Sequence, residues 1–338
     1  MKIILTMIFT LLISSASADS NEEIEFRPDE AENKIGVYIG GELFTNFFYP
    51  DDMEKPVLYP ILTASGKDIT RGYPYNPRPF ERTDHPHHVG LWLNFGDVNG
   101  LDFWNNSFAI DEEDKHRYGS IKFKEVISQD PERGELIVGS DWVDNESNTL
   151  LNEETTFIFR ETNGVRTIKR TSKLTAAQDA VIKGNKEGLL GLRVDRAFEE
   201  PSDSPQRFLD SQGNVTEVRI ENTDGVNGVY RNADGQIGGD VWGERSPWVA
   251  LRAEKDEEVI TVTIFDNQNN PYYPAWSHAR GYGLFGVNNL GGKGMHDDAE
   301  DVEINLSPGE SVSFTHLVVV GGDMSDEELT QMFNDFNK

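Results

Sequence analysis

The sequence contains no cysteine. A disulfide framework, a lipid-attachment cysteine and a zinc site built on paired cysteines are therefore excluded. The fold has to be stable through its hydrophobic core alone. At 338 residues the chain suits one large all-β domain as well as two smaller domains.

Long apolar runs are also missing, apart from one at the N-terminus. Lys2 precedes the apolar residues 3–13, and small residues follow that end in Ala16-Ser17-Ala18. This order is typical of a secretory signal peptide, residues 1–18, cleaved before Asp19. The alternative is a membrane anchor, but the run has about half the length that spans a bilayer. We expect an exported protein, periplasmic or extracellular, without membrane insertion.

Positive charge is scarce, since 31 Lys and Arg oppose 59 Asp and Glu for a net charge of −28. Such a surface repels nucleic acid and anionic lipid, so neither is expected as a partner. The negative charge fits a salty, marine habitat, in which dissolved salt screens acidic surfaces. An anionic substrate would need a local cationic pocket, which makes any arginine near a candidate site informative.

Helical periodicity is rare, and strand patterns dominate. Two β-rich runs flank Asn163-Gly164, the strongest short-range hairpin signal in the chain. Further hairpins are predicted with turns at residues 130–134 and at Ser65-Gly66, and further strands within 246–266 and 311–322. The pattern predicts an all-β fold, a large antiparallel β-sandwich.

The two ends of the mature chain differ from this pattern. Ser325 and Glu328 form a capping box that leads into apolar residues at helical spacing, which predicts one short C-terminal helix. The acidic residues 19–35 are predicted to be a flexible lead-in. The sandwich domain is expected to cover residues 36–338.

Histidine is rare as well, which makes one cluster conspicuous. Three of the seven histidines, His85, His87 and His88, lie within four positions beside Asp84. Pro86 disfavours a regular central strand and predicts a fixed loop before the apolar stretch that follows. Three interpretations stay open: a catalytic site, a catalytic divalent metal and a solvated loop. The usual zinc spacings are absent, so we expect no cofactor, and a divalent metal at the histidines remains the alternative.

A second candidate stretch carries Trp276, His278, Arg280 and Tyr282 at a strict period of two. In a strand, these side chains line one face. The tryptophan ring can cover the apolar face of a pyranose, Arg280 can hold a carboxylate or sulfate, and His278 and Tyr282 can move protons. The alternative is a rim of exposed polar residues around a half-buried tryptophan.

Weaker candidates for substrate binding follow from polar and aromatic residues near these stretches: Asp97, Asn99, Trp104, Glu187 and Arg193. Asp97 and Asn99 are equally typical of a turn. Glu187 and Arg193 can equally form a surface ion pair. Acyl-transfer, nucleotide-phosphate and dinucleotide motifs are absent.

The blocks "YPILTASGKDITRGYP", "DHPHHVGLWLNFGDVNGLDFW" and "FDNQNNPYYPAWSHARGYGLFGVNN" resemble the PmoA-like family of bacterial proteins. The resemblance covers residues 36–322 and departs from the family pattern at Val89, where arginine is expected. The label points to a methane oxygenase subunit, but such a subunit needs spanning helices, so we treat it as a misnomer.

The resemblance implies an activity on carbohydrates in polysaccharide breakdown. It also implies a galactose-mutarotase-like supersandwich, a fold shared with mutarotases and several polysaccharide lyases. The family pattern singles out residues that the residue-level reasoning also selects: His85, His87, His88, Trp276, His278, Arg280 and Tyr282.

The residue types favour β-elimination on a uronic-acid-containing oligosaccharide. Glycoside hydrolysis normally uses two carboxylic acids, and no close pair is evident. A histidine would remove the C5 proton, Arg280 would offset the carboxylate charge, and Tyr282 or another histidine would protonate the leaving oxygen. A mutarotase-like epimerase, a glycoside hydrolase and a non-catalytic sugar-binding protein remain alternatives.

Overall fold

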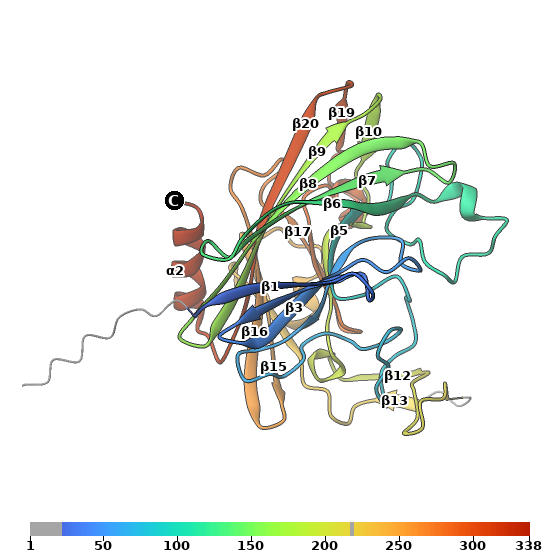
Figure 1. Ribbon diagram of the computed structural model, residues 1–338. Coiled ribbons are helices and arrows are strands. Elements are labelled where there is room, and N and C mark those ends of the chain that lie inside the picture. The colour runs from blue at the N-terminus through green and yellow to red at the C-terminus, as the bar shows by residue number, and fades with distance from the viewer. Residues whose placement is uncertain (1–21, 217–219) are drawn as a thin grey trace, which may run out of the picture.

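The structure, a computed structural model, describes residues 22–216 and 220–338 (Figure 1). Two eight-stranded antiparallel sheets form most of it. Sheet 1 has the order β1 (Ile24–Asp29), β2 (Lys34–Ile39), β3 (Glu42–Phe48), β4 (Val57–Ile61), β5 (Leu91–Phe95), β11 (Gly188–Arg193), β18 (Leu284–Asn288), β17 (Trp276–Arg280). Sheet 2 has the order β14 (Val229–Asn232), β15 (Trp248–Lys255), β16 (Glu258–Asp266), β20 (Ser311–Gly321), β9 (Val165–Ala176), β8 (Thr149–Thr162), β7 (Glu135–Val143), β6 (Ser120–Asp130).

Smaller elements connect and flank the sheets. Two short ribbons pair β10 (Ala180–Lys183) with β19 (Glu303–Leu306), and β12 (Ser202–Gln206) with β13 (Ile220–Asn222). The α-helices are α1 (Gly292–Met295) and α2 (Asp326–Phe336), and the 3-10 turns are η1 (Lys115–Arg117), η2 (Arg196–Phe198) and η3 (Gly238–Val241).

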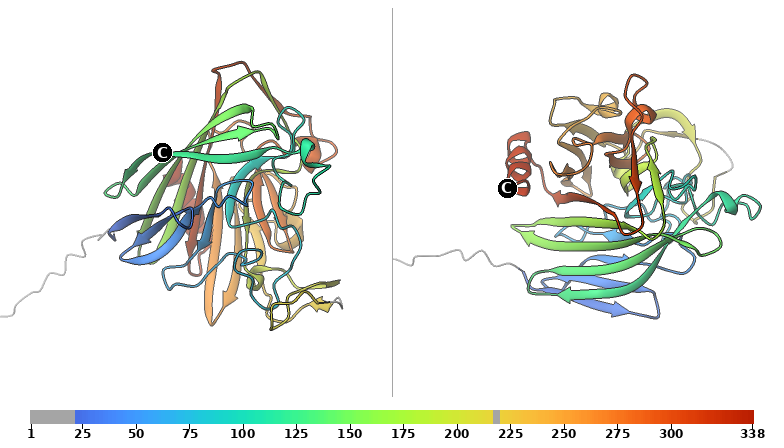
Figure 2. Two further views of the ribbon diagram at one scale, coloured as in Figure 1. Left: turned by 45° about the vertical axis from the view of Figure 1, so that its right-hand side comes forward. Right: turned by 90° about the horizontal axis from the view of Figure 1, so that it is seen from above.

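The two sheets form layers around one main core. Seen from above, strands β6–β9 lie over β1–β3 (Figure 2). Leu93 and Leu190 from sheet 1 and Phe157 and Ile264 from sheet 2 belong to the same buried cluster. The predicted antiparallel β-sandwich is therefore confirmed.

The turn signals of the sequence mark real hairpins. β8 and β9 join at Asn163 and Gly164, which have φ angles of 52° and 78°, and β6 and β7 join across residues 131–134. Positive φ angles at both central residues match the right-handed twist of the flanking strands, which explains the residue choice.

The predicted C-terminal helix is present as α2. The Ser325 hydroxyl accepts a hydrogen bond from the Glu328 amide at 3.3 Å, which completes the capping box. Leu329 and Phe333 pack against Phe265 on the outer face of sheet 2. The helix lies apart from the interface between the sheets (Figure 1).

Two predictions need correction. Residues 24–29 of the expected flexible lead-in form β1, because they pair along their whole length with β2. The chain does turn at Ser65-Gly66, but the returning residues make only isolated bridges, at Asp68 and Thr70. The proposed signal peptide, residues 1–18, lies outside the described residues.

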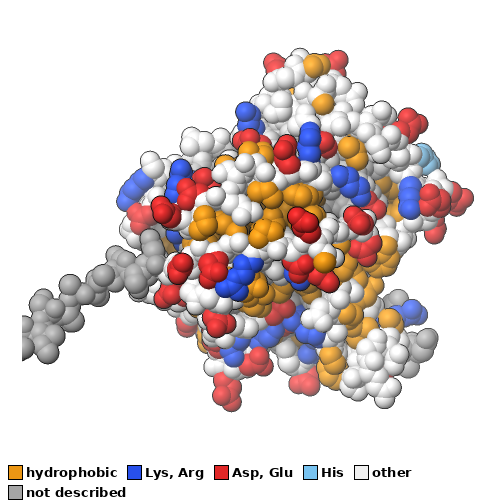
Figure 3. All heavy atoms as spheres, viewed as in Figure 1, with side chains coloured by type: hydrophobic (Ala, Val, Ile, Leu, Met, Phe, Trp, Pro, Cys, Tyr) orange, Lys and Arg blue, Asp and Glu red, His pale blue; other side chains and the backbone are white. Residues whose placement is uncertain are grey.

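The surface mixes both signs of charge despite the acidic composition. On the face drawn in Figure 3, basic side chains are interspersed among acidic ones around a band of hydrophobic side chains. Within residues 22–216 and 220–338, no helix is both long and apolar enough to cross a bilayer.

Candidate functional site

The two candidate stretches meet on the face of sheet 1 that is turned away from the main core. Neighbouring side chains of a strand point to opposite faces. In β17, Ala279 packs in the main core, so His278 and Arg280 on either side of it point to the other face. In β5, Leu93 enters the core while Trp92 packs in a separate cluster on the other face.

Arg71 fixes the loop that carries the first three histidines. Its guanidinium donates to the backbone carbonyl and carboxylate of Asp84 at 2.8 and 2.9 Å. It also donates to the carbonyls of His85 and His88 at 2.8 and 2.9 Å. Arg71 is only 1% exposed, so this loop is held from inside the protein. The sequence analysis missed Arg71, although it lies within one of the blocks that carry the family resemblance.

Arg193 lies behind the same loop, which corrects its predicted contact with substrate. It is fully buried, and its Nη2 donates to the Asp84 carboxylate at 2.7 Å. Its Nη1 lies 3.3 Å from Nδ1 of His88. Because arginine can only donate, His88 accepts at Nδ1 and carries its proton on Nε2. Arg193 therefore orients the loop rather than a ligand.

His85 is the member of the loop best placed to reach a ligand. Its side chain is 40% exposed, whereas its Nδ1 is buried 3.0 Å from the Asp84 carboxylate, without hydrogen-bond geometry. Its φ of 44° is uncommon for a residue other than glycine, and such strain is often found at functional sites. The loop ends at Gly90, where a Cβ atom would lie 2.2 Å from the Leu58 carbonyl oxygen.

The electrostatics around Asp84 favour a permanently charged carboxylate. Burial alone would raise its pKa, but Arg193, His85 and Arg71 hold the pKa of Asp84 well below its usual range. Asp84 can therefore stabilise positive charge on the neighbouring His85 ring.

A series of contacting rings joins the two stretches, and we call it the ring array: His85, His87, His88, Trp92, Trp104, His278 and Tyr282. The His85 ring stacks on His88 and on Tyr282, with centroid distances of 4.8 and 5.0 Å. Trp104 bridges the stretches, because its centroid lies 5.8 Å from that of His88 and 5.9 Å from that of His278.

Tyr282 departs from the predicted period-two face. It lies in the turn between β17 and β18, because β17 ends at Arg280. The phenol nevertheless reaches the first histidine stretch by stacking on His85. Trp104 is fully buried, so it supports the histidines rather than a substrate.

Several polar atoms of the ring array are buried without a hydrogen-bond partner among the described residues: His87 Nε2, His88 Nε2, His278 Nδ1, Trp92 Nε1 and Trp104 Nε1. Buried polar atoms are nearly always paired, and leaving one unpaired costs about 1–3 kcal/mol. Such a concentration in one place indicates a site that water or a ligand completes.

The buried imidazoles are neutral near pH 7. Burial and the charge of Lys55 lower the pKa of His87 to about 2, and burial and Arg280 lower that of His278 to about 3. Burial and His87 also lower the pKa of His88 well below its ordinary value. These three rings can donate or accept hydrogen bonds, but they are weak bases.

Lys55 is a further site residue that the sequence did not reveal. It is 4% exposed, and its ammonium donates to the His87 carbonyl at 2.8 Å. It also lies 5.3 Å from the centroid of the Trp92 ring. Burial lowers the pKa of Lys55 to about 7, against the opposing charges of Asp102 and Glu54.

Arg280 forms the more open wall of the site. Its guanidinium carbon lies 4.2 Å above the Trp242 ring, and it makes no hydrogen bond or ion pair with a residue in the described part of the chain. Trp242, at the end of η3, was missed by the sequence analysis. Stacking holds the guanidinium in place while its five N–H donors stay available.

Trp276 is less available to a sugar than the sequence predicted. Arg245 lies 5.5 Å from the centroid of one of its rings, and His296 stacks on it at 6.3 Å. A Cβ atom on Gly291 would lie 2.8 Å from the indole. The tryptophan is thus packed into the wall rather than presented as an open platform.

A buried carboxylate fastens the hairpin that carries these residues. Asp266 accepts from the amide of Ala275, just before β17, at 2.8 Å. It also accepts from the side chain of Asn289, just after β18, at 3.0 Å. His316 Nε2 lies 3.4 Å from it, and burial raises the pKa of Asp266 to about 6. Both ends of the β17–β18 hairpin therefore converge on one side chain.

The remaining predicted substrate contacts serve other purposes. The Asp97 carboxylate accepts from the Gly100 amide at 2.8 Å, and the Asn99 amide group bonds the backbone of Asp179 and Val181. Asp97 and Asn99 therefore stabilise a turn and a neighbouring strand. This is the structural alternative given for them in the sequence analysis. Glu187 lies 3.3 Å from Lys186 and does not pair with Arg193.

The histidines do not converge as metal ligands. Within the described ranges, no group of three His, Asp or Glu side chains has a geometry that could hold a metal ion. The His85 and His88 rings stack on each other, whereas the His87 ring is nearly perpendicular to both. The arrangement suits proton transfer and hydrogen bonding better than metal binding.

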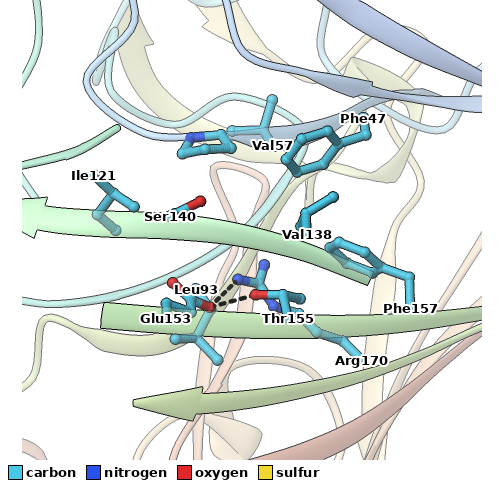
Figure 4. A pocket seen from close by; sticks show the side chains of 11 residues that line it. Phe47, Val57, Leu93, Ile121, Val138, Ser140, Glu153, Thr155, Phe157 and Arg170 are labelled. Carbon is cyan, nitrogen blue, oxygen red and sulfur yellow. Dashed lines mark hydrogen bonds and ion pairs between the residues drawn. The ribbon is translucent and has the colours of Figure 1, made fainter. Parts of the chain in front are cut away.

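A separate small cavity lies between the sheets, away from the ring array (Figure 4). Glu153 and Arg170 face it together with Thr155. The Glu153 carboxylate accepts from Arg170 at 3.0 Å, from Thr155 at 2.7 Å and from the Trp142 indole at 2.9 Å. Both carboxylate oxygens are used, so this cluster is a completed interior network.

A protein-family model matches most of the chain. Residues 34–334 match a model described as a family of unknown function, DUF6807. The chain belongs to this family. No curated protein matches the sequence.

Comparison with solved structures finds sugar-processing proteins at low similarity. The galactosidase domain of an α-galactosidase–sucrose kinase aligns over 88% of this chain with 10% identity and a TM-score of 0.38. This chain spans only 42% of that protein. A galactose mutarotase related enzyme from Lactobacillus acidophilus aligns over 90% of this chain and 99% of its own, with 9% identity and a TM-score of 0.31. A galactose mutarotase-like protein from Lactobacillus casei covers 88% of this chain and 99% of its own, with 12% identity and a TM-score of 0.34.

Proposed function

We propose that the protein is a carbohydrate-active enzyme that carries out β-elimination on uronic-acid-containing oligosaccharides, as a lyase or as a dehydratase. The observation that supports this most is a partly exposed imidazole, His85, backed by the half-buried Asp84 carboxylate. Arg280, which has no carboxylate partner among residues 22–216 and 220–338, lies on the same face. The charges of Asp84 and Arg280 both act on the pKa of Tyr282, which links the two sides of the site.

Exposure favours His85 over the other histidines as the proton acceptor. His87, His88 and His278 have depressed pKa values and buried rings, so they bind a proton weakly. His85 has its exposed edge directed away from Asp84. When its outer nitrogen takes a proton, Asp84 lies next to the resulting imidazolium.

The reaction divides into three roles. Arg280 binds the uronate carboxylate, which stabilises the negative charge that develops as the C5–H bond breaks. His85 takes the C5 proton, a C4–C5 double bond forms, and the C4–O bond breaks. The leaving oxygen receives a proton from the enzyme, the role that the sequence analysis gave to Tyr282 or a histidine. A glycosidic leaving oxygen makes the enzyme a lyase, and a hydroxyl leaving group makes it a dehydratase.

The buried histidines affect the pH dependence expected for the proposed reaction. A histidine of ordinary pKa would cause activity to fall near pH 6.5. His87 and His278 stay neutral far below that pH, so any loss of activity near pH 6.5 would come from another group.

The test is incubation of the purified protein with oligosaccharides that contain uronic acids. The reaction is followed by the ultraviolet absorbance of an unsaturated uronate and by mass spectrometry of the products. Chain cleavage with unsaturated ends indicates a lyase, and loss of one water without cleavage indicates a dehydratase. Saturated products would favour a hydrolase, interconversion without mass change an epimerase, and binding without turnover a sugar-binding protein; each of these contradicts the proposal.

A further inference from the structure

The elimination proposed above, on which this inference rests, requires an acid to protonate the leaving oxygen. Tyr282 is poorly suited to that role. Burial raises the pKa of its phenol, and its ring contacts both the stacked His85 ring and Arg193, whose guanidinium carbon is 5.1 Å from the ring centroid. A side chain with a lower intrinsic pKa and more freedom would be the better proton donor.

Glu200 has these properties and lies at the tip of the same hairpin. Its amide donates to the Gly281 carbonyl at 2.8 Å, between Arg280 and Tyr282 in the chain. A Cβ atom placed on Gly281 would lie 2.8 Å from Oε2 of Glu200. The carboxyl group is therefore held against the turn that links the two predicted site residues.

The other oxygen of Glu200 faces η3. Oε1 lies 3.5 Å from the position of a Cβ atom on Gly238, the first residue of η3. Arg280 extends to Trp242 at the other end of η3. The two side chains thus reach the same short segment without forming an ion pair with each other.

The state of the Glu200 carboxyl group fits a proton donor. It is half-buried and has no hydrogen bond or ion pair to a side chain or backbone group of the described residues. Burial raises the pKa of Glu200, and no neighbouring cation opposes this effect. A carboxyl group in such surroundings keeps its proton to a higher pH than an exposed glutamate does.

We propose that Glu200 is the general acid of this site and donates its proton to the leaving oxygen at C4. His85 removes the C5 proton, the electron pair forms the C4–C5 double bond, and the C4–O bond breaks as Glu200 protonates that oxygen. Glu200 becomes a carboxylate and His85 an imidazolium, so the proton and charge balance is complete. Transfer of a proton from His85 to Glu200 through solvent restores both groups.

Leaving-group substrates separate this role from a structural one. Two uronosides are compared, one with a sugar on O4 and one with 4-nitrophenol on O4, whose anion leaves without protonation. The Glu200→Gln variant should lose about a hundredfold in kcat on the sugar substrate. Its kcat on the nitrophenyl substrate should stay within about threefold of wild type. Glu254→Gln, an exposed glutamate on β15, is the matched control.

The pH profile provides a second readout. An acid must be protonated to act, so wild-type kcat on the sugar substrate should fall as pH rises through the pKa of Glu200. In Glu200→Gln, this alkaline decline should disappear. Thermal unfolding of each variant shows that the comparison is made on folded protein.

Equal losses on both substrates, or no loss on either, would overturn the role of Glu200. The same holds if Tyr282→Phe, rather than Glu200→Gln, shows the dependence on leaving group. These outcomes leave wild-type elimination intact. Absence of any unsaturated product with the wild-type protein would instead contradict the proposed function itself.

Discussion

The interior cluster around Glu153 and the site around Asp84 are built from the same components. Each contains a carboxylate, buried arginine and a tryptophan indole; Glu153 is buried, whereas Asp84 is half-buried. In the interior cluster, Arg170 and Thr155 donate to one oxygen of Glu153 (Figure 4), and the Trp142 indole donates to the other. At the site, Asp84 is equally well bound by Arg71 and Arg193, but the rings around it leave buried nitrogens that have no hydrogen-bond partner in the described part of the chain.

This difference separates a structural network from a functional one. A buried ion pair with all bonds made contributes mainly to the integrity of the fold, and its loss leaves an uncompensated charge. A site whose scaffold is fixed but whose ring nitrogens are unpaired retains polar capacity for a ligand. The predictions below test this contrast.

The largest effect is expected from Glu153→Ala. Arg170 would remain buried without its carboxylate, which should lower the free energy of unfolding by about 3–5 kcal/mol. Urea unfolding measures this. The control is Glu154→Ala, an exposed neighbour on the same strand, which should change stability by less than about 0.5 kcal/mol. A loss below about 1 kcal/mol at position 153 would show that the interior network is not structural.

The second prediction concerns His85. Replacement by alanine should reduce kcat for elimination by about a hundredfold or more, because the base is lost. The free energy of unfolding should change by less than about 1 kcal/mol, because the side chain is 40% exposed. His116→Ala, an exposed histidine of η1, serves as the control. If both variants turn over substrate at the wild-type rate, His85 is not the base.

The third prediction is that acid destabilises both clusters. Burial lowers the pKa of His278 at the site, and of His316 beside the interior network, to about 3. Below about pH 6.5 the unfolded histidines bind protons that the folded ones do not. Each therefore removes about 1.4 kcal/mol of stability per pH unit as pH falls toward 4.

Asp266 acts in the opposite direction between about pH 6 and 4, because burial raises its pKa to about 6 and the folded protein then binds the extra proton. Denaturant unfolding between pH 7 and 4 measures the net slope. His278→Asn and His316→Asn should each reduce that slope by a similar amount. An unchanged slope in either variant would show that the replaced imidazole is not held neutral.

The smallest effect is expected from Arg280→Lys. The charge is kept, but the planar pair of donors and the stacking on Trp242 are lost, so KM should rise about five- to tenfold. Arg252→Lys, whose partner is the exposed Asp323, is the control and should leave KM unchanged. Steady-state kinetics on the uronate substrate decide this. Equal KM values for Arg280→Lys and wild type would remove Arg280 from substrate binding.

Local chemistry explains which features could be predicted from the sequence. The Asn163-Gly164 hairpin and the capping box at Ser325 depend on neighbours within a few residues, and both are present. The hairpin signal at Ser65-Gly66 formed a turn without a second strand. Turn residues determine where the chain reverses direction. Pairing of two strands also requires that the returning residues have a hydrophobic pattern that matches the first strand.

The histidines and aromatic residues of the candidate site could be predicted from the sequence, but the residues that support them could not. Histidines and aromatic residues clustered in short stretches, so their meeting on one face of sheet 1 followed from a single assumption of a shared site. Arg71 and Glu200 act through backbone groups far away in the sequence, such as the His88 and Gly281 carbonyls. Short-range patterns contain no information on such contacts. Asp97 and Asn99 were wrongly selected as substrate contacts, because the polar residues of a turn are of the same types as the residues that bind ligands.

The fastening of the β17–β18 hairpin at Asp266 has a consequence for how a ligand reaches the ring array. A hairpin tied at its base, at Ala275 and at Asn289, moves as one rigid piece. The opposing segment, residues 83–90, is held in turn by Arg71 and Arg193, so both walls of the site are fixed and a ligand must fit between them as they stand. Equally slow exchange of the amides in β17 and in residues 83–90 would reveal a preformed site, in which the arginine wall and the base keep one geometry with and without substrate.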